Sequence, residues 1–576
     1  MAKAYRVFFA LQFGVGLCIA FPLSINAQTV APSQVTPQTM RPSLPSVDDR
    51  LRLPGAPQLT APPQTAGLNF IVGRVVVQGT FLHLDIETLT LVATVEGRRI
   101  TVTQVYELAN ALEQLYARAG YVLVRVTVPP QTLNDRGALR IVVTDGFIEQ
   151  VQVDKVPDQV RALVAQRMAS LVGRRRIKLF EIERRLLLAG DVPGLRLKSV
   201  LARGTTPGGA SLLLEGTQKL VSLTTSVDNR LPASLGTWSY GANLALNSPF
   251  GMGEQFYASA ESAGDLDGIF GSATPLRVLA AGAVLPLGLD GWMLNPEYTN
   301  SRSQPLLANG GLASIGQFER FALRTSYPLI RTRLETLSLN GGLEFINQSV
   351  ALPLFGTDLN TDRYAAIRIG ATYDTGLPWW GQGLQTSATF SKGVGGRNQA
   401  DADASGIPLS RQRADPHFDK AVFDVRLIQP LPDAFRVDLI GRAQISFGDA
   451  MMLSEQFSLD SPQAVSAFPS GTFNVDEGFT LRSELSRPFA VNGFFGPLIL
   501  SPYGFGSFGA GRLKNPTIVE QSTVRAAAVG AGLRSNIEMS GGYQGASLSV
   551  EIARQFSNVP DVEHAWRTNV SLSIRF

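Results

Sequence analysis

The sequence predicts a mainly β protein in which two small α+β domains precede a sixteen-stranded antiparallel transmembrane β-barrel. Beyond the N-terminal region, no run of about 18 apolar residues offers a membrane-spanning helix. From residue 220 onward, segments of roughly ten residues alternate apolar with polar side chains, as strands between lipid and a wet lumen do. Short and long connections also alternate along this region, a regularity that a soluble sandwich has no reason to show.

Residues 1–27 are typical of a secretory signal peptide. A basic start precedes an apolar run over residues 7–21, and residues 24–27 provide a cleavage site. Cys18, the only cysteine, lies inside this segment, so the mature chain should contain no disulfide and no thiolate chemistry. An exported, cysteine-free chain with 56 glycines and only 17% charged residues is predicted to be an envelope protein.

Composition and motifs argue against several functional classes. The net charge of +4 is small and its basic residues are scattered, which excludes a nucleic-acid partner. His83, His417 and His564 stand far apart without metal-ligand spacing, so no metal site is expected. We find no nucleophile elbow or phosphate loop, and therefore expect neither an enzyme nor a bound cofactor.

The region before the barrel divides into a linker and two modules. Residues 28–68 are rich in proline, serine, threonine and glutamine, which predicts an extended linker, within which residues 46–53 could form a short helical turn. Residues 69–146 should form one α+β domain with a strand over 70–77, a helix over 102–119 whose apolar residues share one face, and strands over 122–128 and 139–144.

The second module is expected over residues 147–216. Its pattern predicts a strand over 148–153, helices over 158–171 and 179–189, and strands over 195–202 and 210–215. The basic run at residues 174–176, beside Lys178, could touch lipid headgroups or a partner, or simply form a solvated face.

Residues 217–576 are predicted to be the barrel. Strands should begin near residues 220, 236, 253, 275, 291, 317, 334, 364, 383, 421, 435, 478, 498, 525, 545 and 568, an even number as a bacterial single-chain barrel requires. Connections after even strands are short, as at 249–252, whereas those after odd strands are long, above all about 395–420 and 448–477. Short periplasmic turns and long outer loops give this asymmetry when both termini are periplasmic.

Parity along the strands separates a lipid-facing from a lumen-facing side. Phe423, Val425 and Leu427, for example, alternate with Asp424 and Arg426. The residues that parity assigns to the lumen include Arg320, Arg324, Arg368, Asp424, Arg426, Arg436, Arg442, Arg482 and Glu484. The final strand places Val570, Leu572, Ile574 and Phe576 on one face, and its terminal aromatic resembles the C-terminal signal of outer-membrane barrels.

Several motifs resemble the two-partner-secretion transporters, the TpsB family of haemolysin and filamentous-haemagglutinin exporters. Residues 116–122, 129–131 and 146–148 resemble its polypeptide-transport-associated (POTRA) domain, as do residues 186–188, 193–194 and 207–208 in the second module. The barrel entry matches the family's first hairpin, through Asp228, Asn229, Asn247, Pro249, Gly251 and Gly253.

This resemblance implies a cell outer-membrane protein with periplasmic POTRA domains and a haemolysin-activator-type C-terminal barrel. It also implies a sixth outer loop folded back into the lumen and, in some relatives, a plug helix near the N-terminus. The implied partners are a secreted exoprotein with an N-terminal secretion domain, the lipid bilayer, and the barrel assembly machinery during biogenesis.

The sequence departs from the family at the tip of the sixth loop. Relatives carry Val-Arg-Gly-Tyr or Val-Arg-Gly-Phe there, whereas this chain has Val465, Ser466, Ala467 and Phe468. The facing wall motif, Phe-x-Asp-x-Gly in relatives, is here Phe505, Ser507 and Gly509. Because both charged partners are replaced together, the change is tolerable. We expect Ser466 and Ser507 to share a hydroxyl contact or none, and the loop to be held more weakly.

The functional hypothesis is therefore a transporter that captures an unfolded exoprotein and translocates it through the pore. Its modules would add the extended passenger as a further strand, around residues 195–202. Two alternatives are an outer-membrane protein assembly factor and a diffusion porin. A porin does not need the two modules, and an assembly factor commonly has more of them and does not need this first hairpin.

Overall fold

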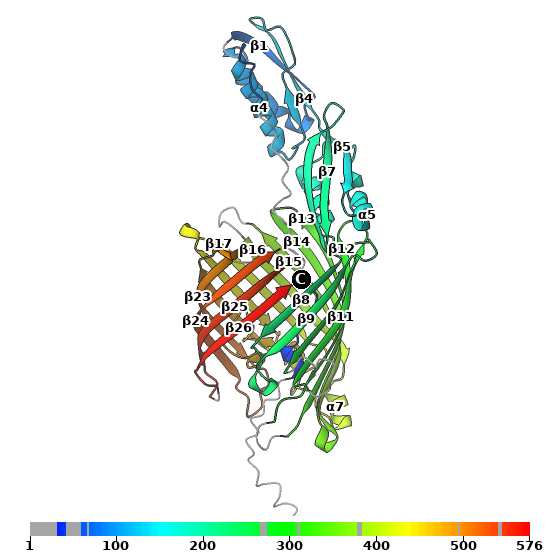
Figure 1. The fold of residues 1–576 in the computed structure, drawn as a ribbon, viewed down its shortest axis with the longest axis vertical. Helices are drawn as coiled ribbons and strands as arrows, with labels where there is room; N and C mark the ends of the chain where they lie inside the picture. Colours follow the sequence, from blue (N-terminus) through cyan, green and yellow to red (C-terminus); the bar gives the residue numbers. More distant parts are fainter. Residues whose placement is uncertain are drawn as a thin grey trace, which may run out of the picture.

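The computed structural model describes residues 31–41, 59–65, 68–264, 274–307, 312–376, 383–493, 496–539, 544–560 and 562–576. Two α/β units stand in series on one rim of a closed β-barrel (Figure 1). The signal peptide expected over residues 1–27 and the helical turn expected over residues 46–53 lie outside the described residues.

The first unit is a four-stranded sheet in the order β2-β1-β4-β3. Val105, Leu108 and Leu112 are buried on one face of the long helix, as their spacing predicted. That helix begins with a capping box between Thr101 and Gln104. Its elements are β1 (Asn69–Gln78), α3 (Asp85–Ala93), β2 (Arg99–Thr101), α4 (Val102–Arg118), β3 (Arg125–Thr127) and β4 (Gly137–Thr144). The sequence analysis missed α3, because its Ile86 and Leu89 are exposed and mark no buried face.

The second unit is a three-stranded sheet in the order β5-β7-β6, with two helices. Its elements are β5 (Phe147–Lys155), α5 (Asp158–Met168), α6 (Leu179–Gly190), β6 (Leu195–Arg203) and β7 (Gly209–Gln218). The core between the helices and the sheet includes Val160, Val164, Leu186 and Leu212. Among the described residues β6 pairs only with β7, so it is an edge strand.

The barrel closes through pairing of its last strand with its first, β26 with β8. Its chain crosses sixteen times, because β21 and β22 are one crossing interrupted at Arg487 and Pro488, where proline lacks an N–H for the ladder. The strands are β8 (Val221–Asp228), β9 (Ser239–Asn247), β10 (Gln255–Ala263), β11 (Leu276–Leu287), β12 (Trp292–Ser303), β13 (Ile315–Arg331), β14 (Glu335–Leu352), β15 (Thr357–Thr375), β16 (Gly383–Gly396), β17 (Asp419–Pro430), β18 (Arg436–Ile445), β21 (Glu477–Ser486), β22 (Phe489–Gly493), β23 (Gly496–Arg512), β24 (Thr523–Met539), β25 (Gln544–Ser557) and β26 (Trp566–Arg575).

The alternation of side chains follows the predicted parity. Ile367 and Ile369 are 43% and 65% exposed on the outer face of β15, while Arg368 between them turns inward to two glutamates. An apolar outer surface with polar groups inside is the arrangement that a bilayer requires of a barrel. No helix among the described residues has the length and apolarity to cross a membrane.

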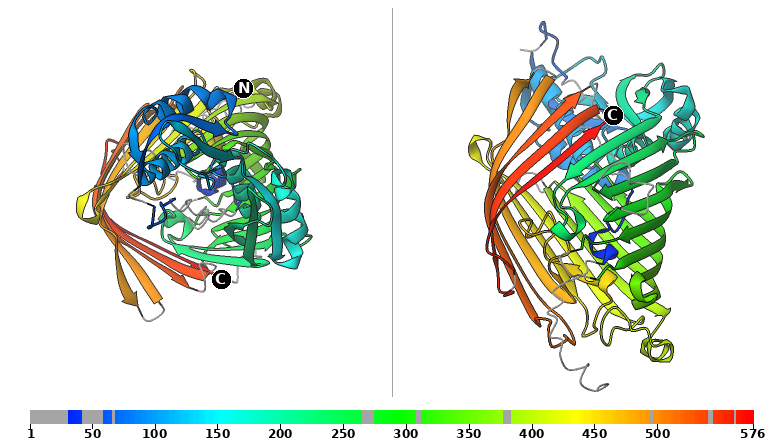
Figure 2. Two further views of the ribbon diagram at one scale, coloured as in Figure 1. Left: turned by 90° about the horizontal axis from the view of Figure 1, so that it is seen from above. Right: turned by 60° about the horizontal axis from the view of Figure 1, so that its bottom comes forward.

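Short elements lie in the connections. The fifth outer loop contains α7 (Gln399–Ser405), and the sixth contains η7 (Leu453–Glu455), β19 (Phe457–Ser458) and β20 (Asn474–Val475). A four-residue helix, α2 (Pro32–Val35), lies inside the barrel (Figure 2). Contacts of α2 with β12, β13 and η7 fix it between the wall and the sixth loop.

Candidate functional site

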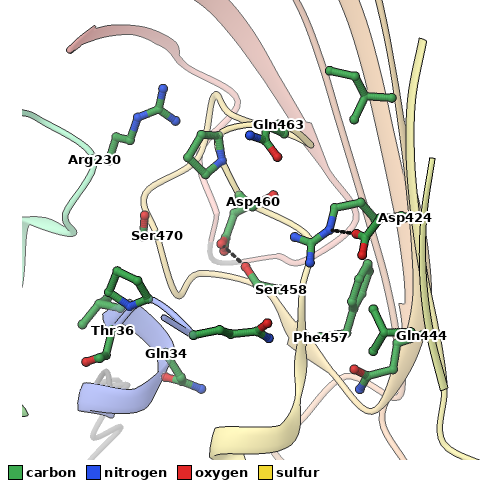
Figure 3. A pocket seen from close by; sticks show the side chains of 18 of the residues that line it. Gln34, Thr36, Arg230, Asp424, Gln444, Phe457, Ser458, Asp460, Gln463 and Ser470 are labelled. Carbon is green, nitrogen blue, oxygen red and sulfur yellow. Dashed lines mark hydrogen bonds and ion pairs between the residues drawn. The ribbon is translucent and has the colours of Figure 1, made fainter. Parts of the chain in front are cut away.

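The barrel interior is filled by two segments, residues 31–41 and the sixth outer loop, residues 446–476. Between them and the wall lies a cavity of about 1070 Å³. Figure 3 shows Gln34 and Thr36 of the N-terminal segment facing Ser458 and Asp460 of the loop across this space. The lumen is therefore occupied rather than open in this structure.

Residues 31–41 are held by charged groups of the wall. Thr39 Oγ1 and the Met40 N–H donate to Glu297 at 3.1 and 3.0 Å. Arg320 donates to the Pro37 carbonyl at 2.9 Å, and Arg324 to the Gln38 carbonyl at 2.8 Å. The segment contributes mainly backbone groups, which can bind the wall with little dependence on its side chains.

The tip of the sixth loop lies against the wall, with Val465, Ser466, Ala467 and Phe468 all buried. Ser466 Oγ donates to Glu551 at 2.5 Å and accepts from Arg482 Nη1 at 2.5 Å. Asn569 donates to the Ser466 carbonyl at 2.7 Å. We expected Ser466 to share a contact with Ser507 or to make none, but its hydroxyl lies between a guanidinium and a carboxylate, both supplied by the wall.

The wall motif on β23 surrounds the same place. The Arg482 guanidinium lies 3.8 Å from the centre of the Phe505 ring, a cation–π contact. A Cβ on Gly509 would lie 3.3 Å from Val465 Cγ2, so this glycine allows the tip to approach closely. The buried Ser507 hydroxyl has no hydrogen-bond partner among the described residues, so it makes no such bond with Ser466.

The two ends of the same loop are fastened by charges. The Glu455 carboxylate accepts hydrogen bonds from Arg368 at 2.7 and 3.2 Å and from Tyr364 Oη at 2.8 Å. It also forms an ion pair with Lys420 at 2.6 Å. Its side chain is 1% exposed. Where the loop returns, Asp476 pairs with Arg411 at 3.5 Å.

The polar residues assigned to the lumen all take part in ion pairs, within the wall or, for Arg368, also with Glu455 of the sixth loop, and some of them are covered. Arg320, Arg482 and Glu484 are buried, because residues 31–41 or the sixth loop lie over them. The pairs formed are Arg320–Glu297, Arg324–Glu344, Arg368–Glu455, Arg442–Asp424, Arg426–Asp438, Arg436–Asp438, Arg482–Glu551 and Arg534–Glu484.

The first-hairpin motif forms the periplasmic turn on which the second unit rests. Gln159 of α5 donates to the Pro249 carbonyl at 2.5 Å and to that of Ser248 at 3.3 Å. Gly251, at φ +75°, lies so close that a Cβ would be 2.3 Å from the Gln159 carbonyl oxygen. A Cβ on Gly253 would meet Leu163 at 2.9 Å. Asn247 reaches across to the Lys219 carbonyl at 2.9 Å.

Helix α6 completes this docking. Asp191, at its C-terminal end, accepts two hydrogen bonds from Arg331 of β13, at 2.6 and 3.1 Å. Arg184 donates to the Pro328 carbonyl at 2.8 Å. Inside the unit, burial lowers the pKa of Arg167, which donates to the Leu188 carbonyl. Arg185 of α6 also pairs with Asp290 in the β11–β12 turn at 2.7 Å, so the second unit is joined to three consecutive periplasmic turns.

Asp228 and Asn229, also in the hairpin motif, lie at the barrel seam. The Asn229 side chain donates to the Thr568 carbonyl at 2.9 Å and accepts from the Val570 N–H at 2.8 Å. Asp228 accepts from the Arg230 N–H at 3.0 Å. At the other end of the seam, the backbone of Phe576 exchanges two hydrogen bonds with Leu223, at 2.8 and 3.3 Å. The motif therefore extends the short pairing between the first and last strands.

The basic run at residues 174–176 joins the two α/β units. Arg176 lies 5.1 Å from the Phe81 ring and Lys178 lies 5.6 Å from the Tyr121 ring, both rings belonging to the first unit. The Leu179 N–H donates to the Gly120 carbonyl at 2.8 Å. These cations are contacts between units rather than a purely solvated face.

Sequence reasoning missed Glu551, Glu455 and Lys420 as anchors of the sixth loop. Parity can place Glu551 and Lys420 on the inner side of their strands, but it cannot say which loop residue they meet. Across the described residues, no group of three or more His, Cys, Asp or Glu side chains is arranged to hold a metal ion.

Comparison with known proteins agrees with this architecture. Residues 212–535 match the model of the haemolysin secretion/activation protein family ShlB/FhaC/HecB, and residues 70–146 match the ShlB-type POTRA domain. The haemolysin transporter ShlB of Serratia marcescens is 26% identical over 459 residues, which cover 76% of this chain and 75% of ShlB. The outer membrane transporter CdiB of Escherichia coli is 24% identical over 447 residues, covering 73% and 70% of the two chains.

A solved structure of CdiB from Escherichia coli has the same fold. Its TM-score is 0.67 at 20% sequence identity, over 95% of this chain and 94% of that one. Because the family model covers more than half of the sequence, the relationship does not rest on the fold alone. The chain belongs to the haemolysin secretion/activation family ShlB/FhaC/HecB, the POTRA-bearing outer-membrane transporters of two-partner secretion.

Proposed function

We propose that this transporter captures an unfolded exoprotein, through that protein's N-terminal secretion domain, on its second POTRA domain and directs it into the barrel. The domain limits that we propose are a linker over 28–68, POTRA domains over 69–146 and 147–216, and the barrel over 217–576. Transport rather than catalysis is the activity, and no cofactor takes part.

The observation that carries this proposal is the position of edge strand β6. Its first residues, Leu195 and Arg196, line a cavity of about 780 Å³ together with barrel residues such as Ser222 and Gln255. An extended chain that pairs with β6 would therefore run to the inner mouth of the barrel. Backbone pairing at a sheet edge holds a passenger with little regard to its sequence.

The hydrogen bonds of β6 show which of its groups are available. The Lys219 N–H donates to the Gly194 carbonyl, and the Gly204 N–H donates to the Gly209 carbonyl. Because strand groups alternate in direction, the even-numbered residues bond to β7 and the odd-numbered ones point away. The N–H of Leu201 is thus directed to the free edge, whereas the side chain of Val200 is 54% exposed beside it.

Passage requires residues 31–41 and the sixth outer loop to leave enough space in the lumen. The sequence contains no nucleotide-binding motif that could supply the energy. We propose that folding of the exoprotein outside the cell drives its export. During biogenesis the exposed terminal residue Phe576 would be the signal for the barrel assembly machinery.

A photoreactive amino acid at Val200 tests capture in growing cells. We expect an adduct with one large exported protein, cross-linked near its N-terminus, and none from the matched position Gln152 on the opposite edge strand β5. Leu201→Pro removes the free N–H and should abolish both the adduct and secretion, whereas Leu201→Ala should keep both. Equal adducts from both edges would refute capture on β6. Secretion that survives deletion of residues 69–215 would favour the diffusion porin.

A further inference from the structure

The sixth outer loop is attached to the barrel at two places that differ in chemistry. We call residues 455–456 and 475–476 the root, and residues 465–468 the tip. At the root, the loop itself carries the charge, Glu455 on one limb and Asp476 on the other. At the tip, the loop contributes a hydroxyl, backbone groups and the apolar side chains of Val465, Ala467 and Phe468, but no charge.

At the root, the charges of loop and wall need each other. The Glu455 carboxylate pairs with both Lys420 and Arg368, and Arg368 also pairs with Glu344. Lys420 is itself buried, and it contacts both the carboxylate and the carbonyl of Glu455. Withdrawing Glu455 would leave these cations of the wall without that compensation, which is strongly unfavourable in a buried site.

The two limbs of the root are also tied to one another. Gln444 of β18 donates to the Glu455 carbonyl at 3.0 Å and to the Asp476 carbonyl at 2.9 Å. Gln456 donates to the Asp476 carboxylate at 3.3 Å, and Phe457 pairs with Val475 in the short β19–β20 ladder. The root therefore behaves as one body fixed to the wall.

At the tip, the wall satisfies its own charges. Arg482 pairs with Glu551 at 2.7 Å and with Glu484 at 2.6 Å, and Glu484 also pairs with Arg534 at 2.7 Å. Two cations thus meet two carboxylates, all on strands β21, β24 and β25. Tyr503 Oη adds a donor to Glu551 at 3.0 Å. If Ser466 moves away, the wall loses one hydroxyl contact, but none of its charged groups is left unpaired. Water can replace the hydroxyl.

We infer that opening of this barrel moves the tip of the sixth loop while the root stays bound. The loop is then a tethered lid: Glu455 is the residue that positions it, and the contact of Ser466 with Arg482 and Glu551 is the point of release. This inference goes beyond passenger capture and does not depend on which exoprotein is carried, so failure of either one leaves the other testable.

Engineered disulfides distinguish tip from root, because the sequence has no cysteine beyond residue 18. Val465→Cys with Gly509→Cys joins the tip to β23, since Val465 Cγ2 lies 3.3 Å from the position of a Gly509 Cβ. The matched pair, Val475→Cys with Gly511→Cys, joins the root to the same strand two residues further on, where the Cβ positions are 3.0 Å apart. Both separations are within reach of a disulfide after small adjustments.

Single-channel recording of the purified full-length protein in planar bilayers gives the readout, with oxidation checked by thiol labelling. Oxidised Val465→Cys/Gly509→Cys should open at least about tenfold less often than its reduced form, because the bond holds the closed state. Oxidised Val475→Cys/Gly511→Cys should match its reduced form. Unchanged opening with the tip bond, or closure by the root bond as well, would overturn the inference.

Charge variants provide an independent test. Glu455→Gln should sharply reduce the fraction of protein that shows heat-dependent gel migration, and adding Lys420→Met should restore part of it by removing an uncompensated cation. Ser466→Ala should fold as the parent does but open several-fold more often, since one hydroxyl contact is lost. A folding defect in Ser466→Ala equal to that of Glu455→Gln would show that tip and root are not different.

Discussion

Replacing Gly251 with alanine should loosen the second POTRA domain from the barrel. The added Cβ would lie 2.3 Å from the Gln159 carbonyl oxygen, so the turn and α5 must separate by about 1 Å to reach ordinary contact. That movement breaks the two hydrogen bonds from Gln159 to Ser248 and Pro249. At about 0.5–1.5 kcal/mol each, their loss weakens the docking by about 1–3 kcal/mol.

Hydrogen exchange of α5 amides measures this loss in the full-length protein. Since about 1.4 kcal/mol corresponds to a factor of ten in an equilibrium, exchange through local opening should accelerate between about fivefold and a hundredfold. Gly288→Ala is the matched control, because Gly288 also has a positive φ, +80°, in a periplasmic turn, but a Cβ there meets nothing within 4 Å. It carries the same backbone strain without the collision. If the α5 amides exchange equally fast in Gly251→Ala and Gly288→Ala, the collision does not govern docking and the reasoning fails.

Three further changes test the other contacts. Arg331→Ala removes two charge-assisted hydrogen bonds to Asp191 and should weaken docking by about 1.5–3 kcal/mol, seen as faster exchange in α6; an unchanged rate would contradict it. Asn229→Ala should lower the temperature at which the barrel loses its folded gel mobility, because two hydrogen bonds across the seam are lost; a parental temperature would show that the seam does not limit stability. Replacing both Arg176 and Lys178 with alanine should broaden the distance distribution between spin labels on the two POTRA domains, since contacts of about 0.5–1 kcal/mol each are lost; an equally narrow distribution would exclude this role for them.

The barrel could be predicted from sequence because its signal is local. Fifteen of the sixteen expected strand starts lie within three residues of the observed ones, since period-two alternation and turn residues mark each strand independently. The exception, expected near residue 364 and observed at Thr357, extends into an outer region where β15 pairs with β14 as far as Leu352. Residues 357–363 are largely polar, so the apolar alternation that would mark the start of the strand is lost there.

Contacts inside the lumen could not be predicted in the same way. Ser466 meets Arg482 and Glu551, which are 16 and 85 residues away, and no local pattern links them. Parity places Arg482 inward but does not say whether water, the N-terminal segment or the sixth loop will cover it. The motif of the first hairpin was recognised as a resemblance, yet the reason for its glycines became clear only when α5 was seen against Gly251.

The wall shows how this chain can hold its loop tip with Ser466 instead of the arginine that the resemblance implies there. A charge carried by the loop must be desolvated with its partner each time the loop returns, and leaves that partner unpaired each time it departs. Here a buried arginine is still present beside the wall motif, stacked on Phe505, but it belongs to strand β21 and is paired with Glu551 and Glu484 within the wall. Ser466 can then approach or leave without creating an unpaired charge. Replacing Ser466 with arginine, the residue that the resemblance implies, would place a second cation against Arg482, so this single change should harm the closed state rather than strengthen it.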